Sequence, residues 1–258
     1  MNDERLPVSW WQFTVIGLLA GFLSGLFGIG GGTIIVPAFV LWLGMQHRLA
    51  AGTSVAAILP MAVSGSISYA VQGNVDWTAA IILAVGIIVG AQVGSLLLVK
   101  LPVRAIQWGF LVFLLIIIVS LWFIVPQRDD VITINFLTGA LLTLTGFITG
   151  ILSGLLGVGG GVIVVPILIF FFGSSDLVAK GTSLVMMIPG SISATMGNFR
   201  RKNVDMRGAA YVGFAGVLAA PFGSLAAGWI DPMWGNVAFS LYLMLVLGQM
   251  LHKQIKNK

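Results

Sequence analysis

The chain has 258 residues, of which 58% are hydrophobic and only 8% charged. Soluble domains carry about 25% charged residues, so the composition excludes a soluble enzyme and indicates a polytopic membrane protein. The net charge of +5 is what membrane topology requires of the loops, and it does not indicate a nucleic-acid partner. Because cysteine is absent and the two histidines, His47 and His252, lie near segment ends, we expect no metal site and no cofactor.

The first half of the chain alternates apolar segments with short polar or glycine-rich connections. Its first segment spans 10–27, where Gly17, Gly21 and Gly25 leave one helical face bare for close packing. A glycine cluster follows, and then a short apolar segment, 33–43, which is about half the length needed to cross a bilayer. Three full spans complete the half, at 50–71, 77–99 and 105–125.

The second half repeats the first with an offset of 129 residues. The stretch 24–37, Ser-Gly-Leu-Phe-Gly-Ile-Gly-Gly-Gly-Thr-Ile-Ile-Val-Pro, returns at 153–166 as Ser-Gly-Leu-Leu-Gly-Val-Gly-Gly-Gly-Val-Ile-Val-Val-Pro. The same offset relates the Gly-Thr-Ser triplets at 52–54 and 181–183, which are expected to open spans. The predicted segments of this half are 132–156, the short 162–172, a span opened by Gly181, a span after the turn at 203–205, and 234–251.

This duplication predicts an all-α membrane protein of 8–10 transmembrane segments. The first repeat half is residues 1–125 and the second is 126–258, and together they form one integrated transmembrane domain. The halves are expected to be inverted repeats, each with a Gly-rich broken helix or hairpin.

The glycine clusters, with apolar sequence on both sides, indicate helix breaks at membrane depth. Irregular backbone is tolerated there only where it is buried in protein or lines a cavity. Glycine adopts positive φ and allows a ligand or another backbone to come close. A helix that restarts at Thr33 or Val162 directs its free N–H groups into the break, and such an end attracts anions. The alternative is that the glycines only let helices pack tightly.

The loop charges distinguish two arrangements of the breaks. If each break is the tip of a hairpin that returns to its own side, the halves are inverted, and all lysines and arginines except Arg128 and Lys180 share one side. If each break lies inside one spanning helix, the repeats are parallel and the cations separate less well. The positive-inside rule favours the hairpins, with both termini in the cytoplasm.

Inverted repeats with interrupted helices are typical of secondary transporters, whose substrate site lies at the midplane between the breaks. The predicted substrate-binding residues are Ser24, Gly30, Gly31, Gly32, Thr33, Thr53, Ser54, Ser153, Gly159, Gly160, Gly161, Val162, Lys180, Thr182 and Ser183. The predicted hinges are Pro37, Pro60, Pro166 and Pro189.

Two of these assignments have alternatives. The hydroxyls of the Gly-Thr-Ser triplets are equally typical of helix caps. Lys180 is the cation nearest the predicted site, but a surface lysine that reaches the membrane interface is the favoured interpretation. No acidic or basic residue is expected deep within a span, so a coupling ion, whether proton or sodium, has no predicted ligand.

The paired Gly-x-Gly-Gly-Gly-x-x-x-x-Pro motifs, each followed by Gly-Thr-Ser, resemble those of the TauE/SafE sulfite exporter family, also called the 4-toluene sulfonate uptake permease family. The resemblance covers nearly the whole chain. It implies a bacterial or archaeal plasma-membrane carrier of sulfite, sulfoacetate or other organosulfonates. One departure is Ala51, which stands where the second half has Lys180, so the two half-sites are not equivalent.

The sequence therefore predicts a secondary transporter, exporter or importer, of small sulfur-containing anions, with the bilayer and a coupling ion as its other partners. The alternatives are an anion channel and an intramembrane enzyme. The enzyme is disfavoured because the chain has no cysteine nucleophile and no buried His-Asp pairing is visible.

Overall fold

The computed structural model describes residues 10–123 and 134–256, and its regular structure over these ranges is entirely helical. The helices are α1 (Trp10–Phe27), α2 (Gly32–Leu41), α3 (His47–Val71), α4 (Trp77–Lys100), α5 (Val103–Phe123), α6 (Phe136–Leu156), α7 (Gly161–Phe172), α8 (Asp176–Arg200), α9 (Met206–Trp229) and α10 (Pro232–Lys256). Seven of them, α1, α3, α4, α6, α8, α9 and α10, are long and apolar enough to cross a membrane. The predicted all-α polytopic membrane fold is confirmed.

Most helix boundaries lie close to their predictions, but α6 begins at Phe136 and not at 132, α10 ends at Lys256 and not at 251, and the starts of α3 and α8 also differ. These helices begin at His47 and Asp176, so the Gly-Thr-Ser triplets lie inside them, and the prediction that the triplets open the spans is wrong. Gln46 and Ser175 are the N-caps instead, and the Ser175 hydroxyl accepts a hydrogen bond from the Val178 N–H at 3.3 Å. The predicted boundary between the halves, at 125 and 126, lies outside the described residues.

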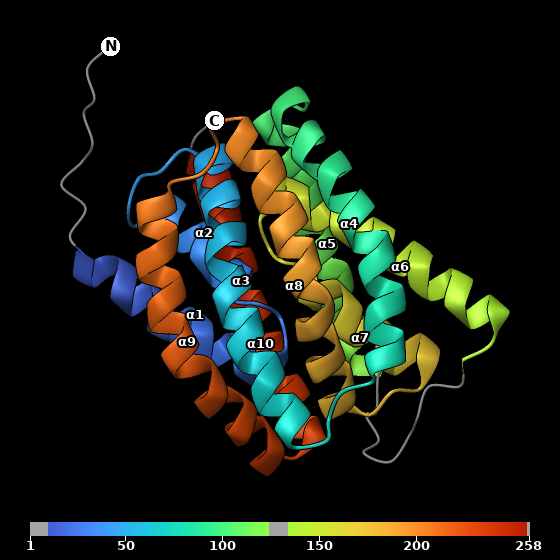
Figure 1. The fold of residues 1–258 in the computed structure, drawn as a ribbon. Helices are drawn as coiled ribbons and strands as arrows, with labels where there is room; N and C mark the ends of the chain where they lie inside the picture. Colours follow the sequence, from blue (N-terminus) through green and yellow to red (C-terminus); the bar gives the residue numbers. More distant parts are fainter. Residues whose placement is uncertain (1–9, 124–133, 257–258) are drawn as a thin grey trace.

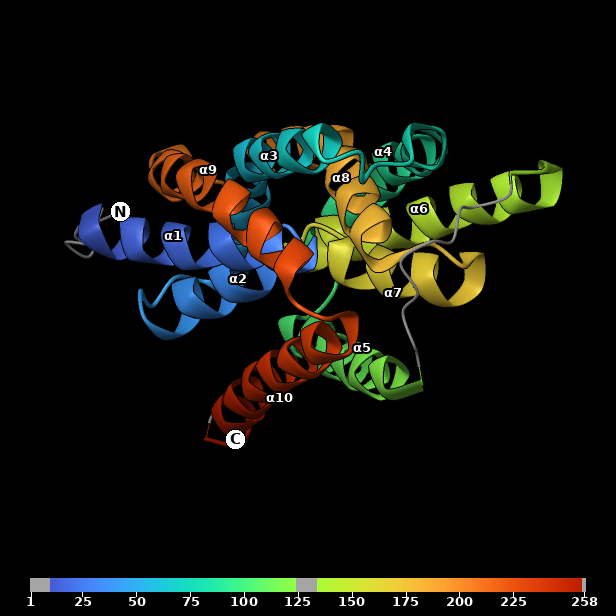
Figure 2. The same cartoon turned by 90° about the horizontal axis from the view of Figure 1, so that it is seen from below.

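The helices are arranged in three layers, which the end-on view in Figure 2 separates. One layer is the row α9, α3, α8 and α4. The second consists of the pairs α1–α2 and α6–α7, and the third of α5 and α10. The two halves are interleaved. Helix α1 of the first half packs on α9 of the second, and α6 of the second half packs on α4 of the first.

Glycines make these two contacts close, as the sequence predicts. Gly17, Gly21 and Gly25 lie against the α9 backbone, and Gly146, Gly150 and Gly154 lie in the same way against α4. A Cβ at any of these positions would meet the facing backbone, so only glycine permits the helices to approach this closely.

Equivalent positions of the two halves lie at opposite ends of the bundle. Thr53, near the start of α3, accepts a hydrogen bond from the Asp205 N–H in the α8–α9 turn, at 2.9 Å. Thr182, near the start of α8, accepts one from the Asp76 N–H in the α3–α4 turn, also at 2.9 Å. We call the first location the Arg48 end and the second the Lys180 end; they are the top and bottom of Figure 1.

The short helices return to the end from which their partners start. Ring contacts between Trp11 and Trp42 and between Phe13 and Phe39, each at 5.7 Å, join the start of α1 to the end of α2. The pair α1–α2 is therefore a hairpin based at the Arg48 end. In the second half, α6 runs in the same direction as α4 and α8 starts at the Lys180 end, so α6–α7 is a hairpin based there.

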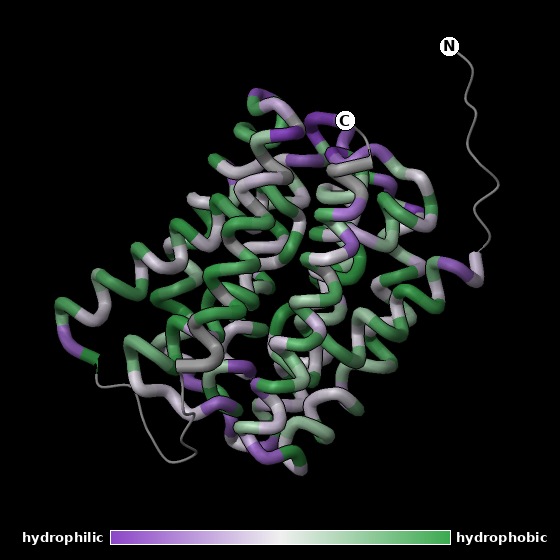
Figure 3. Tube along the Cα trace, turned by 180° about the vertical axis from the view of Figure 1, so that it is seen from behind, coloured by the Kyte–Doolittle hydropathy of each residue, from purple (hydrophilic) through white to green (hydrophobic). Residues whose placement is uncertain are grey.

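The charges divide unevenly between the ends. Figure 3 shows hydrophilic positions mainly toward the two ends and a hydrophobic middle. Among the described residues, the cations at the Arg48 end are Arg48, Lys100, Arg104, Arg200, Arg201, Lys202, Arg207, Lys253 and Lys256. Lys180 is the one described lysine or arginine at the other end, while Arg5, Arg128 and Lys258 lie outside the described residues.

Candidate functional site

Each hairpin turns through a short break built on glycines with positive φ. Between α1 and α2, the φ angles of Gly28, Gly30 and Gly31 are 69°, 77° and 76°. Between α6 and α7, those of Gly157, Gly159 and Gly160 are 74°, 87° and 92°. This left-handed region costs any residue with a Cβ, so the predicted positive-φ breaks are confirmed.

The two breaks touch each other at the centre of the molecule. Gly32 lies against the carbonyl group of Gly157, and Gly161 lies in the same way against the carbonyl group of Gly28. Gly30 and Gly159 face the same two side chains, Ile58 of α3 and Met187 of α8. Both predicted roles of the glycines therefore apply, because they form the helix breaks and also permit close packing.

The helices that follow the breaks start without side-chain caps. Gly31 and Gly160 are the N-cap residues of α2 and α7, and neither helix start has a side-chain hydrogen bond. The first-turn residues Gly32, Thr33, Gly161 and Val162 are all buried. Two uncapped helix N-termini therefore begin beside the meeting point of the breaks, and such ends favour negative charge.

Four of the predicted hydroxyls hold the two halves together. Ser54 donates to the carbonyl oxygen of Gly157 at 2.7 Å, and Ser183 donates to that of Gly28 at 2.6 Å. Thr53 and Thr182 accept from the turns of the opposite half, as described above. None of the four caps its own helix. Each instead bonds to the opposite half of the chain, a role that differs from both predicted ones, ligand contact and helix capping.

Other buried hydroxyls near the breaks have no hydrogen-bond partner. The Oγ of Ser24 and the Oγ1 of Thr33 are in this state, and both residues are fully buried. The Oγ1 of Thr149, on α6 beside Gly160, is in the same state, and Ser153 is buried one turn further on. A buried unpaired hydroxyl costs about 1–3 kcal/mol, so these groups are suited to a polar ligand.

Tyr242 of α10 brings a further unpaired hydroxyl to the first break. Its ring centroid lies 6.4 Å from that of Phe27 with an interplanar angle of 16°, and its hydroxyl lies near that of Thr33.

Lys180 differs most from its prediction. It is only 9% exposed, and its Nζ lies 3.1 Å from Oδ2 of Asp176, which is 2% exposed. The favoured interpretation as a surface lysine is therefore wrong, although the pair lies in the first turns of α8 and not deep within the span. The two residues are four apart at the start of α8, so each charge neutralises the other inside the protein.

Three residues of this region were missed in the sequence: Thr149, Asp176 and Tyr242. Two of them had a signal, because Thr149 precedes Ser153 by one helical turn and Asp176 precedes Lys180 by one. Tyr242 had none, since α10 carries no motif. Pro37, Pro60, Pro166 and Pro189 all lie inside continuous helices, and their role as hinges stays a prediction.

The fold defines a multi-pass membrane protein with two crossed helix breaks, an arrangement typical of transport proteins. The family model described as "Sulfite exporter TauE/SafE" matches residues 2–121 and 142–258, and the chain belongs to this family. The resemblance found in the motifs is confirmed.

The curated relatives have transporter names. The chain is 28% identical over 242 residues to a "Probable membrane transporter protein" of Haemophilus influenzae, covering 91% of this chain and 81% of the relative. It is 30% identical to a protein of the same name from Xylella fastidiosa, covering 82% of each. A third match, 33% identical over 42% of this chain and 24% of the relative, is "Sulfite exporter TauE/SafE family protein 1" of Arabidopsis thaliana. No solved structure matches the chain. The family and these names indicate a transport protein rather than an enzyme.

Proposed function

We propose that this protein is a secondary transporter of small sulfur-containing anions, such as sulfite, sulfoacetate or other organosulfonates, across the plasma membrane. The observation that carries the proposal is the meeting of two uncapped helix N-termini with the unpaired hydroxyls of Ser24, Thr33 and Thr149. Such a site offers N–H and O–H donors from several directions, which suits a compact group with several acceptor oxygens, such as a sulfonate or sulfite. The family name points to the same class of anion.

We also propose that the halves, 1–125 and 126–258, are inverted repeats, with the Arg48 end in the cytoplasm. The cross-half hydrogen bonds of Thr53 and Thr182 support the inversion. The excess of lysine and arginine at the Arg48 end supports the orientation. The start of α1 and the end of α10 lie at that end, so the proposed orientation has both termini in the cytoplasm.

The transport step in this proposal is a change in how the two hairpins meet. The breaks are held by Ser54 and Ser183 from the long helices α3 and α8, while Ile58 and Met187 fill the space between Gly30 and Gly159. Movement of α3 and α8 relative to the hairpins would open the breaks first to one end and then to the other, as in other inverted-repeat carriers.

A binding and flux experiment tests this function. The purified full-length protein is heated with sulfite, sulfate, thiosulfate, sulfoacetate, isethionate and taurine, and a ligand that binds the folded state raises the melting temperature. We expect at least one sulfur oxyanion to raise it and to be taken up by proteoliposomes. A panel in which no anion binds or is carried would refute the proposal. Unitary currents in planar bilayers would indicate a channel instead, and a chemically altered anion would indicate an enzyme.

A further inference from the structure

The buried pair of Asp176 and Lys180 lies beside the first break. An added Cβ at Gly28 would meet the Lys180 backbone, and the Ser183 hydroxyl that holds Gly28 also donates to the Lys180 carbonyl oxygen at 2.7 Å. Charged groups buried inside membrane proteins are costly, and they usually mark the path of a substrate or an ion. The pair therefore lies where a transported anion would reach the break from the Lys180 end.

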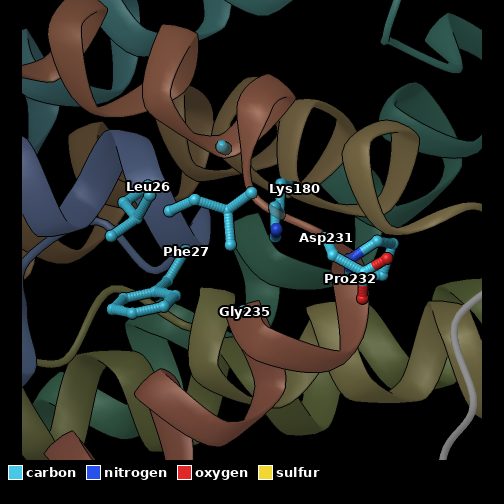
Figure 4. Close-up of a pocket in the computed structure, with 8 residues that line it drawn as sticks. Leu26, Phe27, Lys180, Asp231, Pro232 and Gly235 are labelled. Carbon is cyan, nitrogen blue, oxygen red and sulfur yellow. The ribbon is translucent and has the colours of Figure 1, made fainter.

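A small pocket brings Lys180 to the surface at that end. It is lined by Leu26 and Phe27 of α1, Ala227 of α9, and Asp231 and Pro232 at the α9–α10 turn, together with Lys180. Figure 4 shows the Lys180 ammonium between the end of α1 and this turn. Asp176 is not among the lining residues, so the pocket meets Lys180 but not its carboxylate partner.

The other half has no such pair. The residues equivalent to Asp176 and Lys180 are His47 and Ala51. The residue next to His47 is Arg48, which donates to the carbonyl oxygen of Leu101 at 3.4 Å. The Asp–Lys pair is thus present in the second half and not at the equivalent positions of the first, so the duplicated architecture does not require it.

We propose that the anion and a proton bind together at this pair, so that Asp176 makes the protein a proton-coupled anion carrier. The inference rests on the proposed function. A monoanion added to an intact Lys–Asp pair leaves one uncompensated negative charge in a buried site, which is costly. If a proton from solution adds to Asp176, the neutral acid releases Lys180 to the anion, and the buried charges again sum to zero. Asp176 then carries the proton and Lys180 the anion.

The other titratable groups around the pair leave Asp176 as the proton carrier. The Tyr69 hydroxyl, on α3, donates to the Gly25 carbonyl oxygen at 2.7 Å. Asp231, at the α9–α10 turn, is exposed and accepts from the Met233 N–H at 2.9 Å. Asp76, in the α3–α4 turn, accepts from the Ala79 N–H at 2.9 Å as a helix cap. Asp176 is the buried acid of the group and the one in contact with Lys180.

The test follows anion and proton together in proteoliposomes that contain a trapped pH dye. Isethionate is the probe, because a sulfonate stays a monoanion between pH 6 and 8 and any pH dependence then belongs to the protein. We expect isethionate uptake to acidify the interior. Uptake should also quicken as the outside pH falls, by up to about tenfold per pH unit where one proton must bind.

Variants separate the two roles. Asp176→Asn should abolish both the acidification and the pH dependence of uptake, which a merely structural acid would not do. Lys180→Gln should weaken isethionate binding more than tenfold. The double variant D176N/K180Q leaves no unpaired buried charge, so it should fold as stably as the wild type and still fail to bind. Lys100→Gln, at an exposed cation of the other end, is the matched charge control and should change none of these readouts.

The outcomes distinguish this inference from the proposed function. Uptake of isethionate or another sulfur anion without acidification would overturn the coupling and leave the transporter in place. An Asp176→Asn variant that still acidifies the interior would do the same. Failure of the wild type to carry any anion of the panel would overturn both.

Discussion

The two glycine breaks are the same in their backbone and different in their chemistry. Each has three glycines with positive φ, each lies against the other break, and each is held by a serine of the opposite half at nearly the same distance. These shared features determine how the two hairpins meet.

The differences concern polar groups around that common backbone. The first break has Thr33 in the following helix, and beside it lie Tyr242 and the Asp176–Lys180 pair. The second break has Val162 in place of Thr33, but it has Thr149 where the first half has Ala20. A duplicated scaffold thus surrounds its two breaks with unlike polar groups.

The largest expected effect is all-or-none and tests the inversion itself. Cysteines introduced at Gln72 and Lys202, both exposed and at opposite ends of the bundle, should react with an impermeant maleimide from opposite sides of the membrane. The chain has no native cysteine, so the background is clean. Reaction of both positions from one side would mean that the equivalent turns of the two halves share a side. Labelling after detergent solubilisation controls for access.

The shared backbone geometry of the two breaks was largely predictable from the sequence, because it depends on the internal repeat. The glycine spacing, the 129-residue offset and the shortness of α2 and α7 are all local patterns. The starts of α3 and α8 were placed too late, because Gly-Thr-Ser is typical of a helix start. In the folded chain, the threonines of these triplets accept hydrogen bonds from turns of the opposite half, and a local sequence pattern cannot predict such contacts.

The next largest effect is loss of transport when a break glycine gains a side chain. Gly31→Val and Gly160→Val should abolish uptake, because φ is positive at both positions. A Cβ would also stand 2.7 Å from the Ala20 carbonyl oxygen at Gly31 and 2.5 Å from Thr149 Cγ2 at Gly160. Uptake in proteoliposomes, normalised to inserted protein, is the measurement.

Gly73→Val is the matched control for backbone strain. Gly73 has a φ of 76°, but a Cβ there meets nothing within 4 Å. We expect it to cost about 1–2 kcal/mol of stability and to leave uptake intact. Normal uptake by both break variants would show that the breaks are not the transport site.

A moderate effect should follow loss of the serines that join the halves. Ser54→Ala and Ser183→Ala each leave a buried carbonyl group without its partner, at Gly157 and Gly28 respectively. Each should lower stability by about 1–3 kcal/mol. The two losses should be similar, because the contacts are equivalent. Thermal unfolding in detergent measures them, and a loss confined to one variant would show that the halves are not held alike.

The chemistry of the site was less predictable than its backbone. Ser24 and Thr33 could be proposed because they flank a motif, but the partner state of a hydroxyl depends on residues distant in the sequence. Tyr242 reaches the first break from α10, more than two hundred residues after Thr33. The pairing of Lys180 with Asp176 was within reach of a one-turn rule, and it was missed because Lys180 was assigned to a surface location.

The smallest expected effect tests which break holds the anion. Ser24→Ala and Thr33→Val remove unpaired hydroxyls of the first half, and Thr149→Val removes one of the second. Each should weaken anion binding by about 0.5–1.5 kcal/mol, or a few-fold in Kd, measured by calorimetry with the best ligand of the panel. Ser64→Ala is the control, because this hydroxyl already donates to the Val217 carbonyl oxygen at 2.8 Å and should affect stability but not affinity. Equal losses in both halves would place the anion between the two helix N-termini. A loss confined to Ser24 and Thr33 would place it at the first break, beside Lys180, while losses no larger than that of Ser64→Ala would remove these hydroxyls from the site.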